Sequence, residues 1–196
     1  SMNSARAPIR RKALPSRANV RNVVRAAGFA TTVKTRILAG GVHSAKQQVV
    51  RIDKACPAVT PAMRKRLQAA LTRAAKGADA IIVSDYGSSV VTPEMVEAAL
   101  RGAGRNKPMV LVDSRYAMLG FAGMTATTPN ESEVEAQLGV TIGDDAVALE
   151  RAGRLLLKKT KATAVLITRG SRGMALFQAG LPTEHIPIVG SDEVAD

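Results

Sequence analysis

The sequence is poor in the residues that build several common kinds of site. Its 196 residues include one cysteine, two histidines, no tryptophan, and only five tyrosines and phenylalanines. Cys56 can form no disulfide within the chain, so we expect a free thiol in a reducing compartment, the cytoplasm. His43 and His185 are too far apart to support a zinc site or Ser-His-Asp chemistry. The scarcity of aromatic residues leaves no stacking platform for single-stranded nucleic acid, and no apolar run is long enough to span a membrane.

Acidic residues are absent from the first 52 positions, which hold eleven of the 28 lysines and arginines. The other 17 bases share the remaining sequence with all 16 acids, so most of the net charge of +12 comes from the start of the chain. We expect residues 1–17 to be a basic, flexible leader and residues 18–196 to form one domain. Such a leader suits a nucleic-acid-binding arm, a transit peptide or a surface that faces phosphorylated ligands.

Beyond residue 60 the chain alternates helix and strand patterns. Helices are predicted over residues 60–76, 92–100 and 144–159, and another begins near residue 130. Short apolar runs predict buried strands at residues 80–84, 109–112 and 164–168, with a further short element at 124–127 and later strands at 174–178 and 184–189. This order predicts an α/β fold with a mostly parallel sheet, which binds ligands at the carboxyl ends of its strands.

Residues 31–38 and 47–53 alternate polar and apolar side chains and are joined by a segment that contains glycine. They predict an antiparallel ribbon with a half-exposed face. Lys34 and Arg36 lie on one face of it, where they either hold a phosphorylated sugar or guard a solvated strand edge. Residues 18–28 have helical spacing, with Val20, Val23 and Val24 on one face and Gly28 as the stop signal.

Three groups of polar residues follow predicted strands, and each has two interpretations. Asn130 and Glu133 can hold a magnesium ion through water near a helix start, or cap that helix. Asp85 can bind sugar hydroxyls or a metal, or simply form the turn that follows its strand. Thr168, Gly170 and Gly173 form either a nucleotide-binding turn or an ordinary glycine hairpin.

Several short motifs occur in a fixed order along the chain. They are S-D-Y-G at 84–87, T-P-E-M-V at 92–96, V-D-S-R-Y at 112–116 and T-P-N-E-S-E at 128–133. Together with residues 33–36, 47–53 and 168–174, they resemble the ribokinase-type, or PfkB, carbohydrate kinases. The resemblance covers about residues 31–196 and is strongest to the heptose-phosphate kinase branch, which occurs in bifunctional ADP-heptose synthesis proteins.

The resemblance implies a ribokinase-like three-layer α/β fold in which residues 31–53 form a small antiparallel β lid. It implies phosphoryl transfer from ATP, with Mg²⁺, to a sugar hydroxyl, and a homodimer that forms through the lid. The nucleotide-binding residues that it implies are Asn130, Glu131, Ser132, Glu133, Thr168, Gly170 and Gly173, with Asn130 and Glu133 also at the metal. The sugar-binding residues that it implies are Asn19, Lys34, Arg36 and Asp85.

The sequence departs from the family pattern at several points. Pro15-Ser16-Arg17 stands in place of a glycine platform, Ser88 stands in place of a lysine that follows D-Y-G, and the first strand with its acidic sugar ligand has no counterpart. The sequence ends at Asp196, before a G-A-G-D segment whose aspartate is the family's catalytic base, so we assign no catalytic residue and expect impaired or absent turnover. The alternatives are a non-catalytic module that binds nucleotide or sugar phosphate, one that meets nucleic acid through the leader, and an oligomer that completes its sheet with a partner chain.

Overall fold

The computed structural model describes residues 19–40, 47–105 and 107–188, so the predicted leader lies outside the described residues. The chain divides into two compact units, Ser1–Ala70 and Leu71–Asp196. Helix α1 (Pro61–Ala75) crosses this boundary, and its last turn belongs to the second unit.

The first unit contains the predicted antiparallel ribbon, which is confirmed. Strands β1 (Val33–Ala39) and β2 (Gln47–Lys54) pair in register from Val33↔Lys54 to Ile37↔Val50, and the register shifts between Ile37 and Leu38. Directly paired residues share a face. One face therefore carries the exposed apolar residues Val33, Ile37, Val50 and Ile52, and the opposite face carries Lys34, Arg36, Arg51 and Asp53.

The prediction of a helix over residues 18–28 is wrong. Residues 19–32 contain only isolated turns. The side chain of Asn19 accepts a hydrogen bond from the backbone N–H of Arg21 at 3.0 Å, a local turn that competes with helix formation. Val23 is exposed, so the apolar face gains little burial to offset the low helix propensity of the valines.

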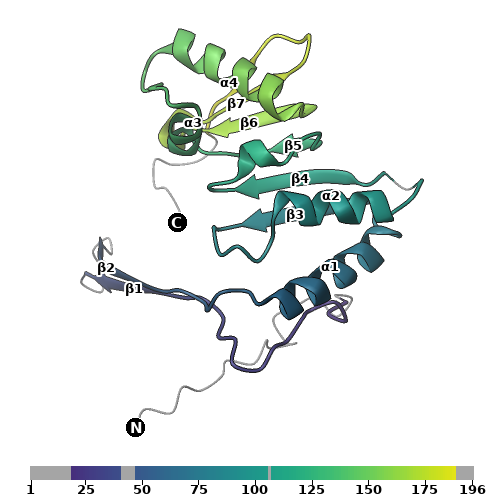
Figure 1. Cartoon of the computed structure of the whole chain (residues 1–196). Helices are drawn as coiled ribbons and strands as arrows, with labels where there is room; N and C mark the ends of the chain where they lie inside the picture. Colours follow the sequence, from purple (N-terminus) through teal and green to yellow (C-terminus); the bar gives the residue numbers. More distant parts are fainter. Residues whose placement is uncertain (1–18, 41–46, 106, 189–196) are drawn as a thin grey trace. The chain divides into compact units, whose positions relative to one another are not determined.

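The second unit is built on a six-stranded mixed sheet (Figure 1). Its strands, in sequence and in spatial order, are β3 (Ala80–Asp85), β4 (Met109–Ser114), β5 (Ala126–Thr127), β6 (Ala164–Thr168), β7 (Met174–Gln178) and β8 (Glu184–Ile186). The pairs from β3 to β6 are parallel, and β7 and β8 are added antiparallel. The prediction of an α/β fold with a mostly parallel sheet is therefore confirmed.

The helices of this unit begin at residues that satisfy their first amides. Thr92 caps α2 (Pro93–Gly102), Asn130 caps α3 (Glu131–Leu138), and Asp145 caps α4 (Ala146–Thr160), one residue later than the predicted start. The described residues of this unit also form two 3₁₀ turns, η2 (Met118–Gly120) and η3 (Gly170–Arg172). None of the described helices has the length and apolar character needed to cross a membrane.

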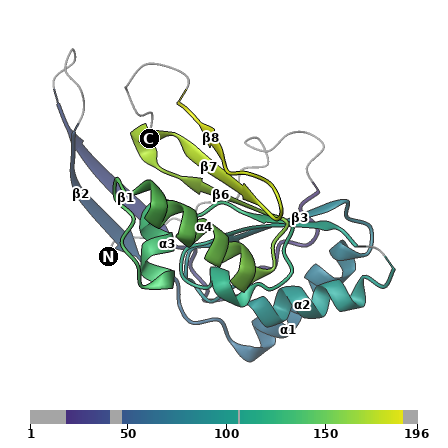
Figure 2. The ribbon, with the colours of Figure 1, turned by 90° about the horizontal axis from the view of Figure 1, so that it is seen from above.

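The core of the second unit lies between one face of the sheet and α2, α3 and α4 (Figure 2). Val83, Val112, Val165, Ile167 and Phe177 supply the sheet side, and Val96, Val134, Leu149 and Leu156 supply the helix side. On the opposite face of the sheet Ile82 is 75% exposed and Met109 is 55% exposed. The prediction of buried strands therefore holds for only one face of β3 and β4, in which buried and exposed residues alternate.

Two predicted apolar stripes are partly wrong. In α1 the structure buries Ala75 rather than Ala74, because Ala75 packs with Ala99 and Ala103 of α2. In α4 the residues Leu149, Ala152 and Leu156 are buried as predicted, but Val147 and Leu155 are exposed. Gly153 takes part in the buried stripe instead, because a Cβ at that position would lie 2.4 Å from the ring of Phe177.

Arg154 joins α4 to the loop between β7 and β8. Its guanidinium donates to the carbonyl oxygens of Gln178 at 2.7 Å and Leu181 at 2.8 Å, and to Oε1 of Glu150 at 2.8 Å. The hydroxyl of Thr183 donates to Glu150 at 2.5 Å, and this bond, followed by Arg154, holds the pKa of Glu150 below its ordinary value. Gln178 pairs with Ala164 at the start of β6, so this cluster lies at the amino edge of the parallel strands.

Adjacent leucines of α4 test the packing. We expect Leu156→Ala to lower the free energy of unfolding by about 2–5 kcal/mol, because Leu156 has no exposed surface and its removal leaves a cavity. Leu155→Ala, at a residue that is 38% exposed, should cost much less. Urea denaturation of both variants measures the difference, and equal costs would contradict this account of the core.

Candidate functional site

The carboxyl edge of the parallel strands gathers most of the predicted site residues. Asp85 and Ser114 are paired at the ends of β3 and β4, and Thr168 ends β6. Asn130, which follows β5, forms a parallel bridge with Thr168, and the Thr168 N–H donates to the carbonyl of Pro129 at 3.0 Å. The start of α3 and the turn after β6 are therefore directly joined by their backbones.

Asn130 and Glu133 form a reciprocal cap at the start of α3. The Glu133 N–H donates to Oδ1 of Asn130 at 2.8 Å, and the Asn130 N–H donates to Oε2 of Glu133 at 3.0 Å. The capping alternative from the sequence is thus realised. A metal role is compatible with it, because a carboxylate oxygen can accept more than one partner, and that role stays a prediction.

The turn after β6 has room for a side chain at Gly170 but not at Gly173. Gly170 and Gly173 have φ values of 56° and 77°, and the Arg169 N–H donates to the Gly173 carbonyl at 2.8 Å. A Cβ on Gly173 would lie 2.2 Å from the carbonyl oxygen of Ile186. Glycine is therefore required for this turn to close against β8.

Glu131, a predicted nucleotide ligand, is engaged inside the protein. Its carboxylate accepts from Nε of Arg169 at 2.8 Å and from Nη2 of Arg172 at 2.6 Å. Ser132, by contrast, is exposed. Sequence reasoning missed both arginines, because they lie 38 and 41 residues from Glu131 and no local spacing connects them.

Asp85 is buried, and protein donors bind both of its carboxylate oxygens. Oδ1 accepts from the Gly87 N–H at 2.9 Å, and Oδ2 accepts from the Ser114 hydroxyl at 2.8 Å. The geometry matches the turn-forming alternative, because it fixes the turn after β3 and ties that turn to the end of β4. Contact between Asp85 and a sugar stays a prediction.

The other predicted sugar ligands belong to the first unit. Asn19 forms the turn with Arg21, and Lys34 and Arg36 lie on the charged face of the ribbon. On that face Arg51 binds Asp53 at 2.7 Å, and this hydrogen bond, with the charges of Arg51, Lys34 and Arg36, holds the pKa of Asp53 below its ordinary value. The face therefore has three cations around one carboxylate.

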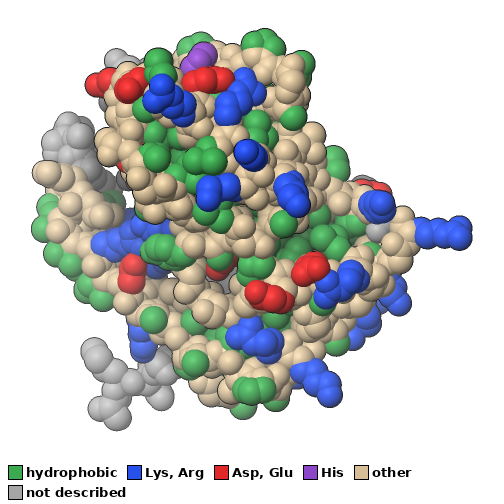
Figure 3. All heavy atoms as spheres, turned by 45° about the horizontal axis from the view of Figure 1, so that its top comes forward, with side chains coloured by type: hydrophobic (Ala, Val, Ile, Leu, Met, Phe, Trp, Pro, Cys, Tyr) green, Lys and Arg blue, Asp and Glu red, His purple; other side chains and the backbone are tan. Residues whose placement is uncertain are grey.

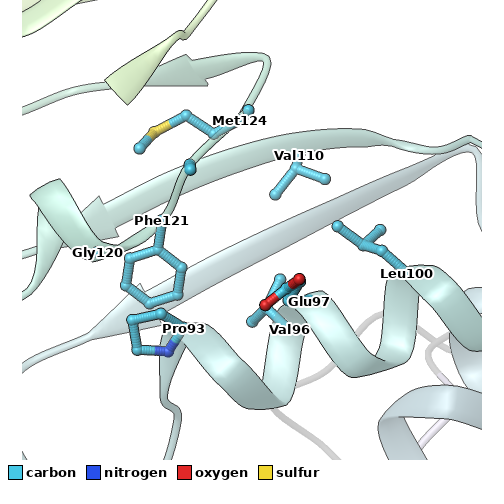
Figure 4. Close-up of a pocket in the computed structure, with 10 residues that line it drawn as sticks. Pro93, Val96, Glu97, Leu100, Val110, Gly120, Phe121 and Met124 are labelled. Carbon is cyan, nitrogen blue, oxygen red and sulfur yellow. The ribbon is translucent and has the colours of Figure 1, made fainter. Parts of the chain in front are cut away.

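A small hollow of roughly 160 Å³ lies elsewhere in the second unit (Figure 4). Its walls come from α2 and from residues 120–124, with Val110 of β4. The lining is apolar apart from Glu97, which pairs with Arg101. None of the predicted site residues lines this hollow, so we do not assign the function to it.

Comparison with known proteins identifies a family. The sequence pattern of the "pfkB family carbohydrate kinase" matches residues 20–196. The bifunctional protein HldE of Pelobacter propionicus is 35% identical over 164 residues, which are 83% of this chain and 32% of that protein. The HldE protein of Geobacter sulfurreducens is 36% identical over 173 residues, or 86% and 34% of the two chains. The chain thus spans about a third of the length of these relatives.

Solved structures of low sequence identity support the fold. Arabidopsis thaliana ribokinase complexed with ribose and ATP matches with a TM-score of 0.59 at 17% identity, over 86% of this chain and 52% of that one. Escherichia coli phosphofructokinase-2 with fructose-6-phosphate matches with a TM-score of 0.57 at 16% identity, over 73% and 46%. The predicted ribokinase-like fold, with its separate small antiparallel sheet, is therefore confirmed.

Two strand-end acids allow a test of the Asp85 geometry. We expect Asp85→Ala to cost about 1–3 kcal/mol of stability, because it leaves the Gly87 amide and the Ser114 hydroxyl without their acceptor. Asp113→Ala removes an acid of the neighbouring strand end that is only partly buried, and it should cost less. Thermal and urea unfolding compare the two, and a fully stable Asp85→Ala variant would refute the structural role.

Proposed function

Because the chain belongs to the pfkB family of carbohydrate kinases, we propose that its second unit binds the ATP and Mg²⁺ of a sugar kinase site. The reaction is transfer of the γ-phosphoryl group to a hydroxyl of a sugar phosphate of the heptose type. One observation carries the proposal: the bridge between Asn130 and Thr168, which joins the start of α3 to the glycine turn at the carboxyl edge of a parallel sheet.

The start of α3 suits the metal and phosphate end of the nucleotide. Asn130 and Glu133 offer amide and carboxylate oxygens, the ligand types that Mg²⁺ prefers, and they would act through water. The positive end of the α3 dipole favours the phosphate charge. A bound Mg²⁺ would neutralise charge that develops on the phosphate oxygens.

The glycine turn suits the rest of the nucleotide. In our proposal Thr168, Gly170 and Gly173 line the nucleotide with their backbone and hydroxyl groups, and Ser132 adds a hydroxyl from the exposed side of α3. Gly170 supports this, because it is exposed and a Cβ there would meet no atom within 4 Å, and a flat ligand needs close approach to the backbone.

We propose sugar-phosphate ligands for each unit separately. In the first unit Lys34 and Arg36 have the charge to bind phosphate, and Asn19 has an amide suited to hydroxyls. In the second unit Asp85 has a carboxylate suited to hydroxyls. No described residue is assigned as the catalytic base, so the proposal is tested by binding rather than by turnover. A cytoplasmic location is part of the same proposal, because the proposed reaction uses ATP.

We further propose a homodimer that forms through the β1–β2 ribbon. The support is the apolar face, on which Val33, Ile37, Val50 and Ile52 are 43–53% exposed. Four neighbouring β-branched side chains on one face of a two-stranded ribbon favour a partner surface. Lys34, Arg36, Arg51 and Asp53 lie on the opposite face, so this interface would not cover them, whereas Lys54 pairs with Val33 at the end of the apolar face.

The second candidate, nucleic-acid binding, gains little support from the face drawn in Figure 3. In Figure 3 the lysine and arginine side chains of the visible face are dispersed among acidic and hydrophobic ones. A groove that follows a phosphate backbone needs a continuous line of positive charge. We therefore favour the kinase proposal over this alternative.

Glu133→Gln separates the proposed metal role from capping, because glutamine can keep the reciprocal cap while losing the charge. We expect unchanged stability and a roughly ten-fold loss of Mg²⁺-dependent ATP affinity, measured by calorimetry with Mg²⁺ and with chelator. Glu135→Gln makes the same charge change on the same helix and should leave affinity intact. Wild-type affinity in Glu133→Gln would remove the metal assignment.

The dimer is tested by charge on the apolar ribbon face. We expect Ile37→Lys combined with Ile52→Lys to convert a dimer into a monomer by light scattering, because four charges cannot be buried across one interface. Val147→Lys, at a residue of α4 that is 58% exposed, is the matched control and should leave the mass unchanged. A wild-type monomer, or a double variant that still dimerises, would end this proposal.

A further inference from the structure

A network of ion pairs joins three segments beside the proposed nucleotide site. Glu131 binds Arg169 at 2.8 Å and Arg172 at 2.6 Å. Arg172 also binds Asp144 at 2.5 Å, and both arginines donate to the carbonyl of Gly143, at 3.0 Å from Arg169 and 2.7 Å from Arg172. The network therefore ties the start of α3 to η3 and to the loop before α4.

The centre of the network is withdrawn from solvent. The side chain of Glu131 is 11% exposed and that of Arg169 is 12% exposed, whereas Arg172 is 40% exposed. Charges that are this buried interact strongly and fix the geometry of the groups that carry them. The Glu131–Arg169 pair is thus the buried, rigid part of the network, and the pair of Arg172 with Asp144 is its solvent-exposed outer part.

The ion pairs account for the charge of both arginines. Arg169 directly follows Thr168, and Arg172 lies three residues further along the same turn, where a cation could be expected to bind phosphate. The structure instead matches two guanidinium groups with the carboxylates of Glu131 and Asp144. Protein carboxylates thus engage both arginines, which suits a role in holding the geometry of the site.

The Glu131–Arg169 ion pair lies one residue after the backbone bridge between Asn130 and Thr168. Glu131 follows Asn130, and Arg169 follows Thr168, so the same two segments are joined once by their backbones and once by a buried ion pair. Two links at adjacent positions restrict rotation of α3 relative to the glycine turn.

We propose that Glu131 is a positioning residue, which acts through Arg169 and Arg172. It sets the metal pair Asn130 and Glu133 at a fixed distance from the Thr168–Gly173 turn, so that one nucleotide–metal complex reaches both. This rests on the proposed function. It assigns to Glu131 an indirect role in nucleotide binding, and to both arginines a role that sequence motifs do not reveal.

The test compares Glu131→Gln with Glu150→Gln. Both remove the carboxylate of a Glu–Arg pair whose arginine also donates to carbonyl oxygens, but Glu150 lies at the amino edge, away from the site. At a temperature where both variants are folded, we expect Glu131→Gln to bind MgATP roughly ten-fold more weakly. We expect Glu150→Gln to bind it like the wild type, whatever stability it loses, and Glu131→Asp to recover part of the affinity.

A second measurement needs no nucleotide. The Thr168 N–H, bonded to Pro129, should exchange with deuterium roughly ten-fold faster in Glu131→Gln and at the wild-type rate in Glu150→Gln. If Glu131→Gln does not fold, Arg172→Gln removes only the outer part and should show a smaller change of the same sign in both measurements.

The outcomes separate the two proposals. Wild-type protein that binds no MgATP overturns the proposed function and the nucleotide role of Glu131 together. If the wild type binds MgATP, two results overturn the positioning role alone. One is a Glu131→Gln variant with the affinity of the wild type, and the other is a Glu150→Gln variant whose affinity falls as much as that of Glu131→Gln. Unchanged exchange at Thr168 in Glu131→Gln also overturns it.

Discussion

Parallel hydrogen bonding from β3 to β6 is the constraint on which the second unit depends. Parallel strands all end at one edge, so a polar residue after each strand is delivered to the same side of the sheet. The bridge between Asn130 and Thr168 extends this pairing beyond the strands themselves. The metal pair and the glycine turn are neighbours for this reason, although 38 residues separate Asn130 from Thr168 in the sequence.

Four of the proposed ligands at this edge also have a structural task. Asn130 and Glu133 cap a helix, Asp85 closes a turn, and Gly173 allows a turn to fit against β8. Dual use of this kind holds each group in place before a ligand arrives, which reduces the entropy that binding must overcome. It also means that loss of binding in a variant is informative only when stability is measured alongside it.

The sequence predicted the fold better than the site, and the reasons differ by residue. Local patterns identified the ribbon, the parallel strands and the caps, since Thr92 and Asn130 act on amides three residues away. The helix over 18–28 failed because spacing alone does not supply a surface for Val20 and Val23 to pack against. Ala75 and Gly153 were missed because their burial is set by Ala99 and Phe177, on other elements. The pairing of Glu131 with Arg169 likewise depends on the fold, and no local sequence pattern indicates it.

The uncovered face of the sheet has a consequence for handling the protein. Ile82 and Met109 expose apolar surface on strands at the end of the described sheet, and β3 is its terminal strand. A terminal strand with exposed apolar side chains can pair with a strand of another molecule. Concentrated samples should therefore lose protein to precipitation through this region, and lysine at position 82 is the simplest remedy for crystallisation or spectroscopy.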